Sequence, residues 1–272
     1  MKKAFGTVLI LLIIVTGLSL LAYPALSNFR SESGGSRAVK EYADKIGQLQ
    51  PAAGSAEFAR AEEYNRALYQ NSVGAEPASV SASDYGFMLN PSADGMMGYI
   101  DIPAISCRLP IYHGTQASTL ESYVGHLPSS SLPTGGESTH CVLTGHTGMP
   151  SAKLLSDLDK VKTGDRFTLT VLDRKLTYEV DSIRVVRPDE TQALAIVEGE
   201  DYCTLVTCTP YGVNTHRLLV RGKRVSEAAP VEADVSDSLV DYLIHDPVML
   251  SLAVILIMLM ITFAVTRRGR EQ

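Results

Sequence analysis

The fold of this chain is decided by residues 204–222, TLVTCTPYGVNTHRLLVRG. Two runs rich in β-branched and apolar residues, 204–207 and 218–221, flank a loop that contains proline, glycine and asparagine. Such runs favour strands, and such loop residues favour turns. The segment therefore predicts a β-hairpin, with Cys208 at the end of its first strand and Arg217 at the start of its second.

This hairpin would bring a thiol and a guanidinium together beside a loop. A side chain at a strand end is held rigidly and stays reachable, as a nucleophile requires. Because side chains alternate between the faces of a strand, Cys208 shares a face with Val206, while Cys203 lies on the opposite face and is expected to be packed. An arginine beside the thiol can favour the thiolate or hold an oxyanion. A structural cysteine and a surface arginine are the alternative interpretation.

A catalytic cysteine also needs an acid or base, and His146 is the candidate. It lies in residues 143–148, LTGHTG, where a strand ends in a glycine-flanked loop that can present an imidazole to a cleft. His216 ranks second, because strand alternation would point it away from the Arg217 side. The other histidines show no partner in the sequence. We expect three of them, His113, His126 and His140, at the surface or in loops. His245 is expected at the membrane edge.

Short β-rich runs recur from Gly98 onward, separated by glycine, proline and aspartate. They span residues 98–102, 107–112, 141–144, 167–172, 176–180, 181–186, 202–207 and 218–221. Several alternate apolar with polar residues, and they follow one another too closely for βαβ crossovers. A single all-β barrel or sandwich is predicted, interrupted by a short helix over residues 151–158.

Two amphipathic helices are predicted before the β-series. Apolar residues recur at helical spacing over residues 38–50 and 56–70, and residues 51–54, PAAG, separate the two segments. Residues 31–36, SESGGS, are expected to form a flexible linker before the first helix. Residues 71–82 lack periodicity and predict a loop.

Both ends of the chain carry long apolar runs, Ala4–Ala22 and Val248–Val265. Each approaches the roughly 20 residues that a helix needs to cross a bilayer. A retained anchor and a cleaved signal peptide both fit the first run, and its length and poor cleavage site favour the anchor. Basic residues flank each run on its terminal side, so both ends are expected inside the cell and the domain between them on the extracellular side of the membrane.

The net charge and the cysteine count limit the classes of partner, disulfide and metal site that are expected. Outside the six charged residues that flank the apolar runs, 19 basic and 29 acidic residues remain, a net charge of −10. An acidic exterior domain argues against nucleic acid or anionic lipid as the main partner and is compatible with protein substrates. If one of the four cysteines is reactive, the other three permit at most one disulfide. No second Cys or His pair completes a zinc site, so no metal is expected.

Residues 204–222 resemble the signature of sortases, especially the class C branch that polymerises pilins. LTGHTG around His146 is similar to the family's histidine motif, and residues 98–103 and 109–115 resemble its first barrel strands. The resemblance implies an eight-stranded β-barrel with Cys208, His146 and Arg217 around one groove. The expected domains are an N-terminal membrane anchor or signal-anchor (1–30), a helical prefix with a lid-like loop (31–97), the catalytic barrel (98–226), a linker (227–246) and a C-terminal transmembrane helix with a basic tail (247–272).

The resemblance also implies a reaction. The Cys208 thiolate attacks the threonyl carbonyl of an LPXTG-like sorting signal and forms a thioester. His146 protonates the leaving glycine amine and later accepts a proton from the incoming amine, while Arg217 holds substrate and the oxyanion. In class C that amine is a lysine of another pilin, and no cofactor or metal takes part. The alternatives are attachment of surface proteins to the cell wall, a hydrolytic cysteine peptidase, and a non-catalytic membrane-tethered binding domain.

Class C sortases usually cover the site with a lid in which Asp-Pro precedes an aromatic residue. Here the corresponding loop contains Glu76, Pro77 and Ala78, so the carboxylate and the proline are kept and the aromatic ring is missing. Glu76 retains a carboxylate for Arg217, whereas Ala78 cannot cover Cys208 as a ring would. The loop therefore predicts a lid without tight self-inhibition, and an ordinary linker is the alternative.

Overall fold

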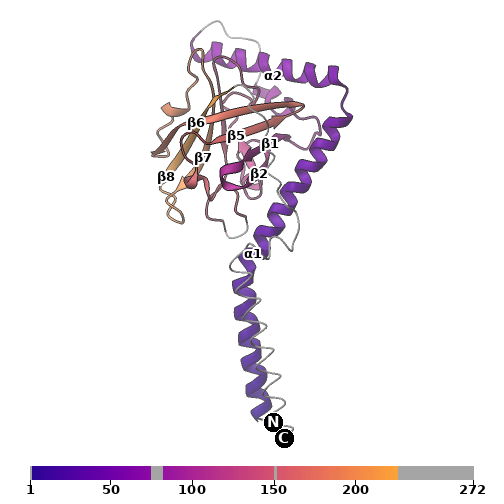
Figure 1. Ribbon diagram of the computed structural model, residues 1–272, viewed down its shortest axis with the longest axis vertical. Coiled ribbons are helices and arrows are strands. Elements are labelled where there is room, and N and C mark those ends of the chain that lie inside the picture. The colour runs from indigo at the N-terminus through magenta and orange to yellow at the C-terminus, as the bar shows by residue number, and fades with distance from the viewer. Residues whose placement is uncertain (1, 75–81, 150–151, 226–272) are drawn as a thin grey trace. The chain divides into compact units, whose positions relative to one another are not determined.

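The structure is a computed structural model that describes residues 2–74, 82–149 and 152–225 (Figure 1). Its contacts divide the chain into two compact units. The first contains residues 1–33, 150–152 and 236–272, and its described N-terminal residues are helical. The second contains residues 34–149 and 153–235, and the strands belong to it.

The second unit is built on a closed barrel of eight strands. Around the barrel the order is β1-β2-β3-β4-β7-β8-β6-β5, and neighbours are antiparallel except for the parallel pairs β2–β3 and β4–β7. The eight-stranded barrel that the resemblance implied is confirmed. Its strands are β1 (Met96–Ile102), β2 (Cys107–His113), β3 (Val124–His126), β4 (Thr139–Thr144), β5 (Arg166–Val171), β6 (Arg174–Val186), β7 (Asp201–Thr209) and β8 (His216–Arg224).

The barrel interior is filled by the apolar side chains that alternate along each strand. Ile100 of β1, Leu205 of β7 and Val220 of β8 are each at most 1% exposed. Burying one such side chain stabilises the fold by about 1.5–3 kcal/mol. Gly222 of β8 leaves room for the ring of Phe167, because a Cβ at this glycine would lie 2.7 Å from that ring. The alternation read from the sequence therefore produces the core.

Three details of the predicted β-series were wrong. The runs 176–180 and 181–186 form one strand, β6, because a bulge between Val180 and Ser182 lets the ladder continue past Asp181. The three-residue strand β3 was missed, since so short a segment shows little alternation. The helix expected over 151–158 is not formed in its described residues. Leu154 has a φ of 42°, in the left-handed region, and turns lead into the 3-10 helix η3 (Leu158–Lys160).

Both predicted helices are present and longer than expected. The helix α1 (Lys2–Gln48) runs through Gly34 and Gly35, so the linker expected over 31–36 was wrong. A glycine costs a helix only about 1 kcal/mol, so the helix continues, and a Cβ at Gly35 would lie in ordinary contact with the Pro110 ring of β2, at 3.5 Å. The helix α2 (Pro51–Ser72) begins at the proline that was expected to separate the helices. Proline is favourable at this first position because its missing N–H would have no partner there.

Within the second unit, the part of α1 from Gly34 onward and one face of α2 pack against the barrel. The buried hydroxyl of Tyr42 donates to the Met97 carbonyl (2.9 Å) and accepts from the Leu172 amide (2.8 Å). Asn65 of α2, which crosses one end of the barrel in Figure 1, exchanges two hydrogen bonds with the Leu132 backbone (2.9 and 2.7 Å). The helical prefix is therefore part of the same core.

Shorter helical segments connect these elements. They are η1 (Ala82–Phe87), η2 (Pro103–Ile105), α3 (Ala117–Leu120) and η4 (Gln192–Leu194).

Among the residues that the structure describes, no helix is long and apolar enough to cross a membrane. The N-terminal span expected over Ala4–Ala22 is therefore not supported. The linker expected over 227–246 and the C-terminal span over 247–272 lie outside the described residues.

Candidate active site

Cys208 and Arg217 are direct partners across the β7–β8 hairpin. β7 ends at Thr209, β8 begins at His216, and the register pairs Cys208 with Arg217. Side chains of cross-strand partners project from the same face, with Cβ atoms about 4.5–5.5 Å apart. The juxtaposition predicted from the sequence is confirmed, while the catalytic roles of the two residues stay predictions.

The loop between β7 and β8 supports the Arg217 guanidinium. Nη1 of Arg217 donates to the carbonyls of Asn214 (3.3 Å) and His216 (3.1 Å). Asn214 has a φ of 59°, a left-handed conformation that asparagine tolerates, and its backbone N–H donates to the Pro210 carbonyl (2.9 Å). A guanidinium carries five N–H donors, of which Nη1 supplies two. The turn residues thus hold Arg217 beside the thiol, and within the part of the chain that the structure describes its Nε and Nη2 donors remain for a ligand.

Cys208 lies on the outer face of β7, and Cys203 lies inside the barrel. Cys203 is 0% exposed, whereas Cys208 is partly exposed. Burial raises the pKa of the Cys203 thiol well above its usual value, which keeps the thiol protonated. Cys141 is its partner in the β4–β7 register, and all four cysteines are free thiols. The expectation that Cys203 serves packing is confirmed.

His146 follows β4, which runs parallel beside β7. Thr144 pairs with Val206, and the Gly145 amide donates to the Val206 carbonyl (3.1 Å). The hydroxyl of Thr207, the next residue of β7, donates to the Gly145 carbonyl (2.8 Å). His146, the next residue, therefore lies where β7 approaches Cys208. The structure brings the ends of β4 and β7 and the start of β8 together. Cys208 lies in β7, Arg217 lies in β8, and His146 follows β4 by two residues.

Two histidines expected at the surface or in loops are buried strand residues. His126 and His140 are 0% and 1% exposed. The ring nitrogens of His126 contact the Tyr85 hydroxyl (2.9 Å) and the Ser131 carbonyl (2.8 Å). The expectation was wrong because Tyr85 lies on a distant segment that only the fold brings near, although Ser131 follows His126 closely in the sequence. His113, also expected there, is half-buried and contacts two backbone carbonyls.

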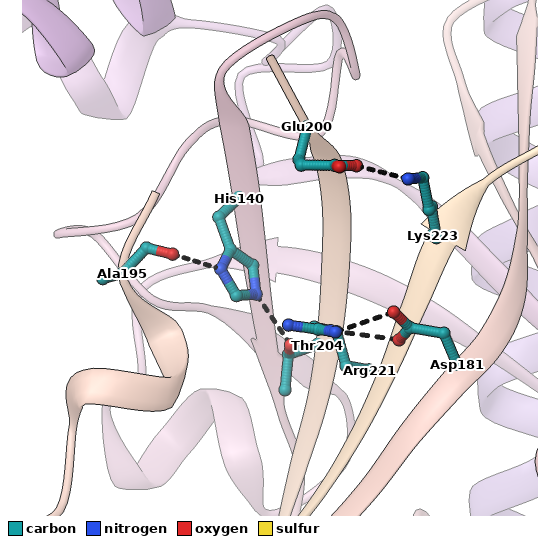
Figure 2. A network of polar contacts seen from close by, with 7 residues as sticks. All are labelled: His140, Asp181, Ala195, Glu200, Thr204, Arg221 and Lys223. Carbon is teal, nitrogen blue, oxygen red and sulfur yellow. Dashed lines mark hydrogen bonds and ion pairs between the residues drawn. The ribbon is translucent and has the colours of Figure 1, made fainter. Parts of the chain in front are cut away.

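His140 ties the loop before β7 to the sheet. Its Nδ1 donates to the Ala195 carbonyl (2.8 Å), so the neutral ring accepts from the Thr204 hydroxyl at Nε2 (2.7 Å) (Figure 2). Burial lowers the pKa of His140, which favours this neutral form. Ala195 directly follows η4, so the imidazole links β4, β7 and the β6–β7 connection. No signal in the sequence identified this contact.

Charged side chains line the outer face of β6 and β8 next to this histidine. Arg221 forms a two-pronged ion pair with Asp181 (3.0 and 2.7 Å), and Lys223 pairs with Glu200 (2.6 Å) (Figure 2). A surface pocket adjoins the Arg221 side chain. It is lined by Ser182, Arg184, Ala193, Thr204, Leu219 and Arg221.

The lid residues predicted before the barrel, Glu76, Pro77 and Ala78, lie outside the described residues. Their position relative to Cys208 stays a prediction.

Solved sortase C structures share this architecture. Sortase C1 from Streptococcus agalactiae is 48% identical, with a TM-score of 0.66, and the match covers 71% of this chain and all of that one. Sortase C from Streptococcus pneumoniae is 42% identical, with a TM-score of 0.64 and coverage of 72% and 100%. Sortase C from Clostridium perfringens is 41% identical, with a TM-score of 0.60 and coverage of 70% and 99%.

Sequence comparison gives the same family. The sequence model of the sortase domain matches residues 100–225. Sortase D of Bacillus subtilis is 32% identical over 139 residues, which make up 50% of this chain and 67% of that protein. The chain therefore belongs to the sortase family of cysteine transpeptidases, and class C sortases are among its close structural matches.

Proposed function

We propose that this protein joins pilin subunits through an acyl-enzyme at Cys208. The observation that carries the proposal is the cross-strand pairing of Cys208 with Arg217 beside the end of β4, where His146 follows. A thiol, a fixed guanidinium and an imidazole at adjoining strand ends supply a nucleophile, an oxyanion donor and a proton carrier. The identity of 41–48% to solved sortase C structures supports the polymerising branch.

The proposed reaction has two halves. The Cys208 thiolate attacks the threonyl carbonyl of an LPXTG-like signal, and Arg217 donates to the oxygen that becomes negative. The Thr–Gly bond breaks, and His146 gives its proton to the glycine amine that leaves. An incoming lysine amine then loses a proton to His146 and attacks the thioester, which releases the thiolate and forms an isopeptide bond.

The acceptor distinguishes this proposal from its alternatives. The structure of the Streptococcus pneumoniae relative was described in terms of pilin substrate specificity, and here a pilin lysine is the proposed acceptor. A cell-wall amine would make the protein an attaching sortase, and water would make it a peptidase. A binding domain would hold the signal without cleaving it.

The test is incubation of the purified protein with a pilin subunit that carries an LPXTG-like signal. Covalent ladders on a denaturing gel, with a Thr–Lys isopeptide identified by mass spectrometry, are the expected result. Cys208→Ala should abolish the ladder, and Cys203→Ala, the matched interior control, should keep it. Cleavage without ladders would indicate hydrolysis, capture only by a peptidoglycan amine would indicate wall attachment, and binding alone would indicate a non-catalytic domain.

The proposed location is the cell membrane, with the barrel on its outer side. This location rests on the two apolar runs and their basic flanks in the sequence. Labelling of intact cells with a membrane-impermeant thiol reagent tests it. Cys208 should react before lysis, and reaction only after lysis would reject the location.

A lid formed by residues 76–78 is part of the proposal. A lid mutant of Streptococcus agalactiae sortase C1 is among the solved structures similar to this chain. With alanine at 78, closure would rest on one ionic contact, which is worth little when exposed. Ala78→Tyr should therefore slow thiol labelling of Cys208, and an unchanged rate would show that this loop does not cover the site.

A further inference from the structure

The outer face of the barrel carries a pocket beside the candidate active site. Its floor is a row of cross-strand partners, in which Arg221 of β8 pairs with Ser182 of β6 on one side and Thr204 of β7 on the other. Arg184 and Leu219, partners in the next row of the same face, complete the floor. Ala193 of η4 adds one wall.

The pocket and the Cys208–Arg217 pair lie on the same face of the same strands. Thr204 and Cys208 are four residues apart on β7, and Arg221 and Arg217 are four apart on β8. Four residues of a strand span about 13 Å. An extended peptide bound along this face covers that distance with four of its own residues, so one substrate can occupy both places.

The wall of the pocket is held in place by His140. Ala193 lies in η4, and the carbonyl of Ala195 just after η4 accepts the Nδ1 proton of His140 (2.8 Å). The same ring accepts from Thr204 on the pocket floor (2.7 Å) (Figure 2). One buried imidazole therefore joins wall and floor, and the pocket is formed before a ligand arrives.

The polar groups of the pocket favour an anion. Arg221 uses Nε and Nη2 for Asp181, so the two N–H groups of Nη1 are not part of that ion pair. Asp181 offsets the charge of Arg221, and the exposed Arg184 adds a second guanidinium, which leaves a positive balance. The Ser182 hydroxyl is a further donor. Outside the charged residues that flank the apolar runs, the chain has a net charge of −10, so this local positive site differs in sign from the chain as a whole.

We infer that this pocket binds an acidic side chain of the protein substrate, on the N-terminal side of the bond that is cleaved. The inference rests on the proposed function, because it places the threonine of an LPXTG-like signal at Cys208. The residue four positions earlier, immediately before the leucine, then reaches Arg184 and Arg221. Aspartate or glutamate at that position binds more tightly than a neutral residue.

The test uses the Cys208→Ala protein and three fluorescent peptides that differ only in the residue before the LPXTG-like signal. By fluorescence anisotropy, the glutamate peptide should bind about fivefold more tightly than the glutamine peptide, as one partly exposed ion pair permits, and the lysine peptide more weakly than both. Arg184→Gln should remove the preference. Arg187→Gln, which changes an exposed arginine outside the pocket lining, should keep it.

A second variant distinguishes a lost binding preference from a loss of folding, because it should increase the preference. Asp181→Asn removes the carboxylate that Arg221 now binds, so it should increase the preference for glutamate. Equal binding of the glutamate and glutamine peptides, or binding of neither, would overturn the acidic pocket. Cleavage of the glutamine peptide by the parent enzyme is measured separately. If the peptide is cleaved but binding shows no preference for glutamate, the proposed function stands and the acidic pocket is rejected. If binding shows the preference but no peptide is cleaved, the pocket is supported and the proposed reaction is rejected.

Discussion

Replacing Arg217 by lysine separates the charge of this residue from its shape. Arg217 is the cross-strand partner of Cys208, and its Nη1 donates to the carbonyls of Asn214 (3.3 Å) and His216 (3.1 Å). Lysine keeps the positive charge but presents one compact ammonium on a flexible stem instead of a planar fork. The substitution therefore tests whether position-specific donors, rather than positive potential, stabilise the oxyanion.

The magnitude follows from the number of donors that remain. Removing one fixed oxyanion donor typically lowers turnover by about 100–1000-fold, or roughly 2.7–4 kcal/mol. Arg217→Ala supplies no donor and should show this full loss. Arg217→Lys supplies a charged donor from a different position, so we expect an intermediate loss of at least about tenfold in kcat/KM, about 1.4 kcal/mol. Because Arg217 is partly exposed, the free energy of unfolding should change by less than about 1 kcal/mol.

The assay is the rate of thioester formation with an LPXTG-like peptide, measured beside urea unfolding of each variant. Arg187→Lys is the matched control, since this exposed arginine pairs only with acidic residues of its own loop among the described residues. A lysine variant that reacts at the parent rate would refute the reasoning, because diffuse positive potential would then suffice. A rate loss matched by an equal loss of unfolding free energy would assign Arg217 a structural role.

Three further predictions concern reactivity, stability and pH. A thiol reagent should label Cys208 in the folded protein and reach the buried Cys203 only after denaturation; equal rates would show that the barrel does not protect its interior. Tyr42→Phe leaves the Met97 carbonyl and the Leu172 amide without their buried partner, so the free energy of unfolding in urea should fall by about 2–4 kcal/mol. The control Tyr23→Phe, at an exposed position, should change it hardly at all. A similar small loss in both variants would show that α1 is not docked. Burial lowers the pKa of His140 from its ordinary 6.5, so the imidazole binds a proton more tightly in the unfolded chain than in the folded one. The free energy of unfolding should therefore decrease as the pH falls below about 6.5. His140→Gln should therefore lose less stability than the parent between pH 7 and pH 5 in urea titrations, by at most about 1.4 kcal/mol per pH unit, and equal pH slopes would contradict this.

Local sequence patterns predicted secondary structure correctly where the alternation, periodicity or turn residues of one short segment indicate its conformation. Alternation along 204–207 and 218–221, with turn residues between them, predicted the β7–β8 hairpin and the pairing of Cys208 with Arg217. It also placed Cys203 on the interior face. Helical periodicity located the end of α2 to within two residues and its start to within five. Local patterns gave a wrong prediction at Gly34 and Gly35, because glycine weakens a helix without ending it. There α1 continues, and Gly35 lies beside Pro110 of β2.

By itself, the sequence determined the all-β class of fold and the hairpin, because alternation and turn chemistry act between residues close in the chain. Its motifs, through their resemblance to the family, also indicated the three residues proposed for catalysis. The tertiary structure decided what depends on distant segments meeting. It joined two predicted runs into β6, added β3, and buried His126 beside Tyr85 and His140 beside Ala195, which lie far away in sequence. It also assembled the pocket from β6, β7, β8 and η4, which come together only because the sheet closes into a barrel in the order β7-β8-β6. No local pattern encodes that neighbourhood, since it arises from the register of strands that are not consecutive.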